Sequence, residues 1–122
     1  MTQKTNVWPD EIRLNSGKNE LRVAFQGGRS FDYEAEYLRV MSPSAEVQGH
    51  SPDQRVTVPG KQDVLISALE PVGNYAVRIT FDDGHNTGLF SWDYLHELGV
   101  THHVRWGEYL DELKAKGLSR TR

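Results

Sequence analysis

Short runs of alternating apolar and polar residues, joined in pairs by turn sequences, place the strongest limit on how this chain can fold. The runs cover residues 12–14, 20–25, 64–69 and 75–81, and the turns that join them cover residues 15–19 and 70–74. Alternation over a few residues is typical of a strand with one buried face, and such turns join antiparallel neighbours. A further turn at residues 82–84 precedes another short run at 87–90. The pattern therefore predicts β-hairpins in a small, mainly antiparallel sheet.

Two short helices are expected to follow the strands. Residues 34–40 have the composition of a helix that ends near Pro43, because a proline disfavours helical geometry in the residue before it. Ser91 is placed to cap a second helix, and Gly99 is placed to end that helix in the left-handed conformation. Tyr37 is expected to face the core.

A C-terminal helix is expected over residues 101–117, with Thr101 as its cap. Its apolar residues fall at helical spacing and are Trp106, Tyr109, Leu110 and Leu113. Residues 118–122 should fray. Residues 42–61, which are rich in proline and glycine, should form a loop with a brief strand around 56–58. The predicted fold class is therefore α+β, with hairpins, two or three short helices and a C-terminal helix.

The two halves of the chain echo each other. Residues 22–38 and residues 78–95 both read as a strand, a glycine turn, a second strand and the start of an aromatic helix. Any hairpin followed by a helix gives a similar pattern, and two copies are too few for a solenoid. We interpret the echo as a sign of duplication.

Size, charge and cysteine content narrow the class of protein. The chain has 122 residues, the usual size of one domain, so residues 1–122 are treated as a single domain. A formal charge of −3 favours neither nucleic acid nor a membrane as a partner. The absence of cysteine excludes disulfides and zinc sites that depend on thiolate. With no apolar run suited to a membrane span or a signal peptide, we expect a cytoplasmic protein.

The common catalytic signatures are missing. The sequence contains no G-x-S-x-G, no G-x-x-x-x-G-K-[ST], no G-x-G-x-x-G and no H-E-x-x-H. No histidine is followed two residues later by Asp or Glu, the spacing on which a 2-His-1-carboxylate iron oxygenase site normally draws. We therefore do not expect an enzyme in its own right.

Four motifs, in order, carry a resemblance to a known family. They are LRVMSPSAEV at 38–47, PVGNYA at 71–76, FDDGHNTG at 81–88 and SWDYL at 91–95. Together they resemble the gamma-butyrobetaine hydroxylase-like N-terminal domain family over about residues 9–99. Residues 101–117 look like the C-terminal helix of the short bacterial members that consist of this domain alone.

The resemblance implies a zinc site that this sequence does not retain. In the full hydroxylases the domain precedes a 2-oxoglutarate- and iron-dependent oxygenase domain and binds zinc through three Cys and one His. The positions that match the thiolates are Ser42, Ser44 and Val47, and only the histidine is kept, as His85. Hydroxyls and a valine do not replace thiolates around zinc, so we expect no zinc site of the family form. The family also occurs fused to a P-loop ATPase of iron–sulfur cluster assembly in chloroplasts, which suggests an adaptor.

His85 is the first candidate for a rebuilt metal site. With His50 and with Asp83 or its neighbour Asp82, it offers an N/O ligand set for a divalent metal such as zinc or iron. The alternative is that a histidine after an Asp-Gly turn hydrogen-bonds within its own loop.

Arg39 and Trp92 are the candidate binding residues. Arg39 is expected either to pair with Glu46 or the 82–83 turn, or to form an anion site. Trp92 belongs to a set of aromatic residues that suits either a ligand-stacking face or, for most of its members, core packing. The other members are Tyr37, Tyr75, Phe90 and Tyr94. Trp8 and Trp106 are the aromatic residues expected to be exposed.

Three functions are compatible with these observations. The favoured one is a non-catalytic adaptor that binds another protein, as monomer or homodimer, with a link to iron or iron–sulfur metabolism implied by the resemblance. The alternative is a metal-binding domain with an altered ligand set around His85 and His50. The third is a small enzyme or an accessory subunit of an oxidoreductase, which would require a deep pocket with converging acids or histidines.

Overall fold

The computed structural model describes residues 7–121, in which two three-stranded antiparallel sheets are combined with four α-helices. The strands are β1 (Pro9–Leu14), β2 (Glu20–Phe25), β3 (Ser30–Glu34), β4 (Ile66–Val72), β5 (Ala76–Phe81) and β6 (Leu89–Ser91). The helices are α1 (Ala35–Val40), α2 (Ala45–Gln48), α3 (Trp92–Val100) and α4 (His102–Ala115), with one 3₁₀ turn, η1 (Pro52–Gln54). The predicted α+β fold is confirmed.

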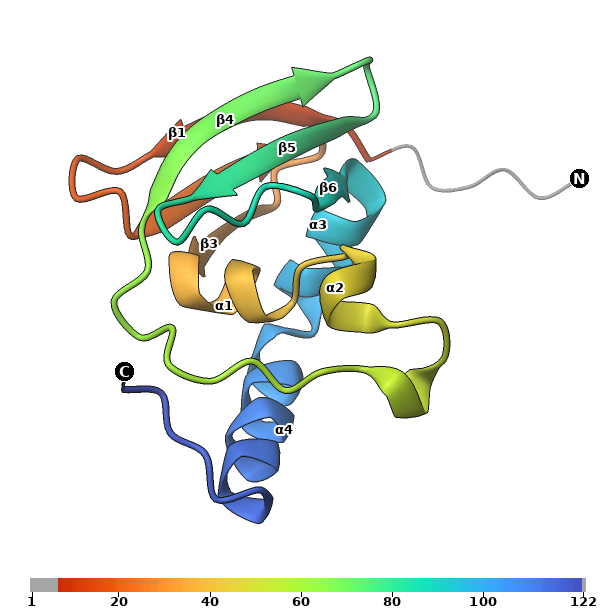
Figure 1. Cartoon of the computed structure of the whole chain (residues 1–122). Helices are drawn as coiled ribbons and strands as arrows, with labels where there is room; N and C mark the ends of the chain where they lie inside the picture. Colours follow the sequence, from red (N-terminus) through yellow and green to blue (C-terminus); the bar gives the residue numbers. More distant parts are fainter. Residues whose placement is uncertain (1–6, 122) are drawn as a thin grey trace, which may run out of the picture.

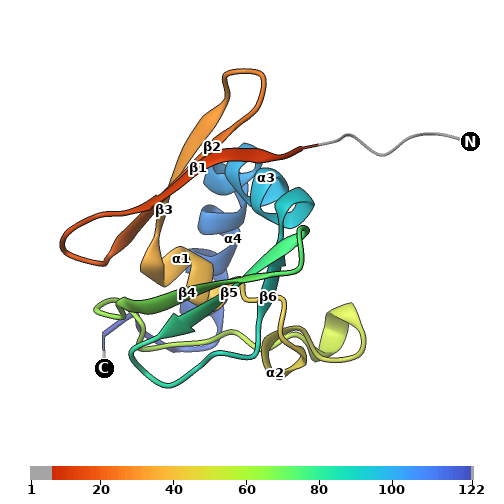
Figure 2. The same cartoon turned by 90° about the horizontal axis from the view of Figure 1, so that it is seen from above.

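Each sheet is a meander in which sequential strands pair. The orders are β1-β2-β3 and β4-β5-β6. Every second residue of the central strands points into the core, as Leu21 and Val23 do in β2 and Ile79 in β5, and this alternation fixes the register. Both sheets lie on the same side of the molecule, with the helices beneath them (Figure 1). Seen from above, the strands of the two sheets run at an angle to each other (Figure 2).

The internal echo corresponds to a repeated unit in the structure. In each half, the third strand runs directly into a helix: β3 into α1, and β6 into α3. Two buried tyrosines bind the halves together, because the Tyr33 hydroxyl donates to the Leu95 carbonyl at 2.6 Å and the Tyr37 hydroxyl donates to the Leu98 carbonyl at 2.7 Å. Burial raises the pKa of both hydroxyls above their ordinary range, so they remain donors.

The beginning of α3 was predicted correctly and its end was not. The Ser91 hydroxyl accepts the Tyr94 N–H at 3.1 Å, as an N-cap should. Gly99, however, lies within the helix, which continues to Val100. A Cβ atom at Gly99 would lie 2.4 Å from Cγ of Phe31, so glycine is needed here for close approach of the aromatic ring.

Thr101 is the N-cap residue of α4, as predicted, but its side chain does not cap the helix. Its hydroxyl instead donates to the Glu97 carbonyl at 2.7 Å. The prediction that Trp106 is exposed was wrong, because it packs against the core, whereas Leu110, which was placed on the apolar face of α4, is exposed. Trp8 is exposed, as expected.

Two predictions for the loops were wrong. Residues 56–58 form no strand: the Val56 N–H donates to the Val47 carbonyl at 2.7 Å, and the Val58 carbonyl accepts the Tyr109 hydroxyl at 2.6 Å, so this segment is bound to helices instead. Residues 118–122 were expected to fray, yet Ser119 and Arg120 are bound to the body of the domain; residue 122 lies outside the described residues. Within the described residues, no helix has the length and apolar character needed to cross a membrane.

Candidate functional site

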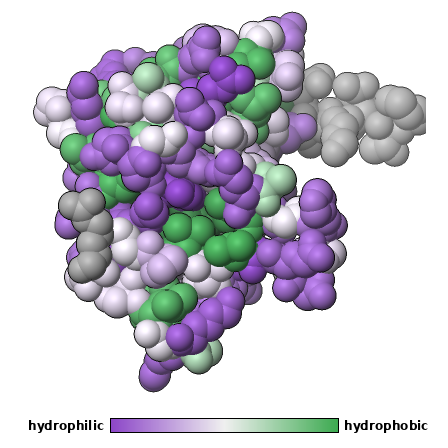
Figure 3. Space-filling model, in the orientation of Figure 1, coloured by the Kyte–Doolittle hydropathy of each residue, from purple (hydrophilic) through white to green (hydrophobic). Residues whose placement is uncertain are grey.

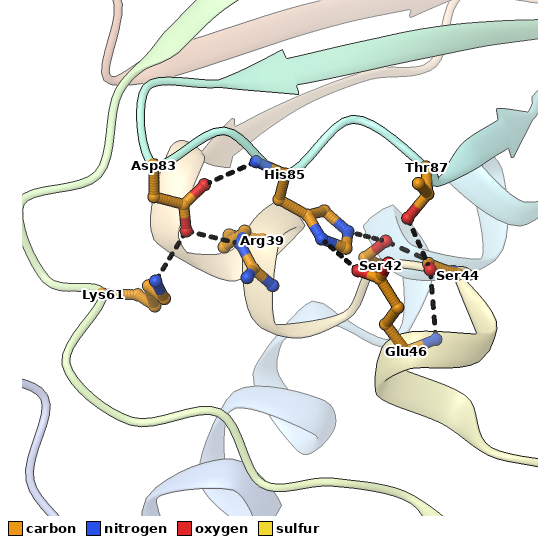
Figure 4. Close-up of polar contacts among 8 residues, drawn as sticks. All are labelled: Arg39, Ser42, Ser44, Glu46, Lys61, Asp83, His85 and Thr87. Carbon is orange, nitrogen blue, oxygen red and sulfur yellow. Dashed lines mark hydrogen bonds and ion pairs between the residues drawn. The ribbon is translucent and has the colours of Figure 1, made fainter.

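A cluster of hydrogen bonds and ion pairs joins the α1–α2 segment to the loop between β5 and β6 (Figure 4). Its members, which we call the His85 cluster, are Arg39, Ser42, Ser44, Glu46, Lys61, Asp83, His85 and Thr87. All of its members except Lys61 belong to the sequence motifs at 38–47 and 81–88. Segments far apart in the chain therefore meet at one place.

Local structure places the two serines toward the β5–β6 loop. Ser44 is the N-cap of α2, and its hydroxyl accepts the Glu46 N–H at 3.1 Å. The Ser42 hydroxyl accepts the Ser44 N–H at 3.2 Å. From these positions the Ser44 hydroxyl lies 2.7 Å from the hydroxyl of Thr87, on the other side of the cluster.

Both ring nitrogens of His85 are engaged. Nε2 lies 2.9 Å from the Ser42 hydroxyl and Nδ1 lies 3.2 Å from Oε1 of Glu46. Burial lowers the pKa of His85, and the charge of Arg39 lowers it further, against the opposing effect of Glu46 and Asp83. The ring is therefore neutral at pH 7, and Nδ1–H donates to Glu46 while Nε2 accepts the Ser42 hydroxyl proton.

This connectivity is that of a Ser-His-acid catalytic triad, but the serine is closed off. The Ser42 side chain is completely buried, and a Cβ atom at Gly88 would lie 2.3 Å from its hydroxyl oxygen. The same oxygen already accepts the Ser44 N–H. A nucleophile has to reach a substrate carbonyl, and Ser42 has no space in front of it. The arrangement thus serves to hold two segments together.

Asp83 is the centre of a second set of contacts. Its Oδ2 lies 2.8 Å from Nε of Arg39 and 2.6 Å from Nζ of Lys61, and its Oδ1 accepts the His85 N–H at 3.1 Å. Burial opposes ionisation of Asp83, but the hydrogen bonds from Lys61, the His85 backbone and Arg39 outweigh it and lower its pKa to about 2. The expected pairing of Arg39 with the 82–83 turn is confirmed, through Asp83.

A small cavity lies beside this ion cluster. It is lined by Gly60, Lys61, Asp63, Val64, Asp82 and Asp83 and has a volume of about 110 Å³. Pockets that bind drug-sized molecules have roughly 300–1,000 Å³. This cavity is therefore too small to enclose a drug-sized molecule.

The proposed metal ligands do not form a three-ligand set. His50 lies in the loop after α2, where its N–H donates to Oε1 of Gln54 at 3.0 Å. The carboxylate of Asp83 is occupied by Arg39 and Lys61. Among the described residues, no group of three or more His, Cys, Asp or Glu side chains is arranged to hold a metal ion.

The structure brings together two of the positions that the resemblance relates to zinc, Ser42 and His85. Ser42 contacts His85 directly, and the Val47 N–H donates to the Ser44 carbonyl at 3.0 Å. Val47 is buried and offers no donor atom. Two hydrogen-bonded hydroxyls and an aliphatic side chain are not ligands for zinc, so the residues present do not fit that metal. Hydrogen bonding replaces coordination at this place in the fold.

The aromatic candidates divide between the core and one exposed edge. Tyr37 and Phe90 are fully buried. Trp92 is half-buried, and its indole N–H donates to the Asn74 carbonyl at 2.9 Å. Tyr75 is the last residue of the turn between β4 and β5 and is 55% exposed. Its position directly after Gly73 and Asn74 is the sequence signal that distinguishes it from the buried aromatic residues.

Comparison with known proteins identifies the same family as the four sequence motifs. A family model described as gamma-butyrobetaine hydroxylase-like, N-terminal, matches residues 12–96. No curated protein matches the sequence.

Several solved structures are similar to this one. One NMR solution structure has 45% sequence identity, covers 93% of this chain and 90% of that chain, and has a TM-score of 0.80. A second has 42% identity, covers 98% and 90%, and has a TM-score of 0.82. A third is the crystal structure of a DUF971-family protein of unknown function from Acidithiobacillus ferrooxidans, with 37% identity, coverage of 75% of this chain and 91% of that chain, and a TM-score of 0.62.

Proposed function

Because the chain belongs to the gamma-butyrobetaine hydroxylase-like N-terminal family, we propose that it is a non-catalytic adaptor that docks onto a protein partner. The resemblance to domains that accompany an oxygenase or an iron–sulfur assembly ATPase suggests a partner in iron or iron–sulfur metabolism. Fold-level analogy does not identify function, so the proposal depends on what the surface offers.

The observation that carries the proposal is the aromatic edge formed by the exposed Tyr75 and the half-buried Trp92. The Trp92 N–H donates to the Tyr75 carbonyl at 3.1 Å, and the Trp92 indole N–H donates to Asn74. These bonds fix the turn that presents the Tyr75 ring. Tyrosine and tryptophan are enriched at the centres of protein interfaces because they bury a large area at a small cost in conformational entropy.

The remaining surface and the interior favour docking over chemistry. The face of the molecule in Figure 3 is mostly hydrophilic, with apolar residues confined to small areas. Recognition through a few rigid anchors suits such a surface. In the interior, the donors and acceptors of His85 and Asp83 are used to join the α1–α2 segment to the β5–β6 loop.

The experiment compares the wild type with Tyr75→Ala. Wild-type protein immobilised on beads captures its partner from an extract of its source cells, and the partner is then purified and its affinity measured by calorimetry. Loss of an interface anchor costs about 2 kcal/mol, so Tyr75→Ala should weaken binding roughly thirtyfold.

The matched control is Val104→Ala. Val104 is 59% exposed on α4, away from the aromatic edge, and its truncation should leave the affinity unchanged. A wild-type protein that captures no partner, or a partner whose affinity is the same for Tyr75→Ala, would contradict the adaptor proposal.

A further inference from the structure

The C-terminal segment places one arginine, Arg120, against α1, α4 and the loop that precedes β4, and we call the surface that Glu36, Trp106 and residues 60–62 present to it the groove. The guanidinium of Arg120 makes a two-pronged ion pair with Glu36: Nε lies 2.8 Å from Oε2, and Nη2 lies 2.7 Å from Oε1. The Arg120 guanidinium also lies over the ring of Trp106, 5.3 Å from its centre. A carboxylate and an aromatic face together are a geometry selective for arginine over lysine.

Backbone hydrogen bonds continue the recognition along the segment. The Gly60 N–H donates to the Ser119 carbonyl at 2.9 Å, and the Gln62 N–H donates to the Arg120 carbonyl at 3.1 Å. Main-chain bonds of this kind bind an extended peptide without regard to most of its side chains, while a pocket selects one side chain.

The receptor side of the groove is held in place without the C-terminal segment. Glu36 lies in the first turn of α1, so its backbone is positioned by that helix. The loop that supplies Gly60 is fixed on one side by the Tyr109 hydroxyl, which donates to the Val58 carbonyl. On the other side it is fixed by Lys61, which pairs with Asp83 in the His85 cluster.

The segment itself is held mainly through one side chain. Residues 114–119 are exposed, and only Arg120 is inserted. Its side chain remains 38% exposed. Gly117, with φ of 66°, turns the chain out of α4 just before the segment. Because one side chain after a glycine turn makes most of the contacts, an arginine of another molecule can displace Arg120 from the groove.

We propose that this groove is a binding site for an arginine-bearing extended segment of a partner protein, which the chain's own residues 118–121 occupy in its absence. The inference rests on the proposed function for the existence of a partner, and on Glu36, Trp106 and the Gly60–Gln62 amides for the chemistry. The chain's formal charge of −3 adds a general attraction for a basic segment.

The chain's own segment determines how tightly the wild type can bind an added arginine peptide. A tethered segment is present at an effective concentration on the order of millimolar, so an incoming peptide competes against it. Removing the internal arginine removes the competitor. Full-length Arg120→Ala should therefore bind an arginine peptide at least tenfold more tightly than the wild type does.

The test uses a capped synthetic peptide of residues 118–121 and a copy with alanine in place of its arginine, titrated by calorimetry into full-length Arg120→Ala. We expect the arginine peptide to bind and the alanine peptide not to bind. Adding Glu36→Gln to Arg120→Ala should abolish binding. Circular dichroism verifies that each variant is folded.

If Arg120→Ala does not fold, the wild type provides the measurement. At millimolar peptide the chain's own segment should be displaced, so the amide resonances of Ser119 and Arg120 should shift with the arginine peptide and stay unchanged with the alanine peptide. Equal response to both peptides, or to neither, overturns the groove as a binding site. That result would not contradict the adaptor proposal, because the adaptor proposal is tested by the effect of Tyr75→Ala on partner binding. Conversely, a failure of the Tyr75→Ala experiment would not change the result of the peptide titration.

Discussion

The effect of Gly99→Ala on the free energy of unfolding should depend on the residue at position 31: the substitution should destabilise the protein with Phe31 and stabilise it with alanine there. In an ordinary helix interior, alanine is more stable than glycine by about 1 kcal/mol. Gly99 lies inside α3, so this gain is available. However, a Cβ atom at position 99 would lie 2.4, 2.6 and 2.7 Å from Cγ, Cδ2 and Cδ1 of Phe31, closer than atoms can approach.

The magnitude follows from these two opposing effects. Forcing an extra carbon against a packed ring typically costs about 1–3 kcal/mol. Subtracting the helical gain, Gly99→Ala should destabilise the wild type by about 0–2 kcal/mol. With Phe31→Ala the ring is absent, so Gly99→Ala should stabilise that variant by up to about 1 kcal/mol. The coupling between the two positions is thus about 1–3 kcal/mol.

The assay is equilibrium unfolding in urea of the wild type, both single variants and the double variant. Contacts of Phe31 with Phe25 and His96 are lost equally in Phe31→Ala and in the double variant, so they cancel from the coupling energy. A coupling near zero, with Gly99→Ala equally destabilising at both backgrounds, would refute the close approach. It would instead favour a left-handed helix end at Gly99, where alanine is strained regardless of its neighbours.

Three further predictions concern the His85 cluster and α3. Because burial depresses the pKa of His85, the native state binds fewer protons than the unfolded chain; stability is full above about pH 6.5 and falls as pH drops below it. Urea unfolding at about pH 7.5 and about pH 5 should show this loss in the wild type, and an equal loss in His85→Gln would refute its assignment to His85. Asp83→Asn leaves the charge of Arg39 without its partner and should lower the free energy of unfolding by about 2–4 kcal/mol. In the control, Asp82→Asn, the side chain can still accept the Leu65 N–H, so the free energy of unfolding should change by no more than about 0.5 kcal/mol. If thermal unfolding shows similar effects for the two variants, this reasoning is wrong. Ser91→Ala removes the cap of α3 and should cost about 1 kcal/mol in the same assay, with no change in stability as the opposing result.

The parts of the fold that sequence reasoning predicted are those determined by neighbours along the chain. The hairpins follow from alternation and turn residues, and the Ser91 cap from its position before an apolar helix. Gly99 was misread because its neighbour in space, Phe31, belongs to β3, and no local pattern reveals that contact. Glycine after an apolar helix is usually a helix end, and tertiary packing overrode that preference here.

The candidate site shows the same division. The family motifs singled out Ser42, Ser44 and His85, and these residues do meet. That Glu46 rather than His50 is the partner of His85 depends on how α2 folds back over the β5–β6 loop, which spacing alone does not encode. Docking of Arg120 was missed for a similar reason, since a short polar segment after Gly117 looks frayed until its partner Glu36 is placed beside it.

The central claim is that His85 is held in a hydrogen-bonded cluster and not in a metal centre. Elemental analysis of purified, untagged full-length protein by inductively coupled plasma mass spectrometry tests it most directly. The wild type should contain far less than one zinc or iron per chain. A positive control is the triple variant Ser42→Cys, Ser44→Cys, Val47→Cys, which restores thiolates at the three positions that the resemblance relates to zinc and should acquire zinc. A stoichiometric metal in the wild type that is lost in His85→Ala or His50→Ala would contradict the claim and make this a metal-binding domain.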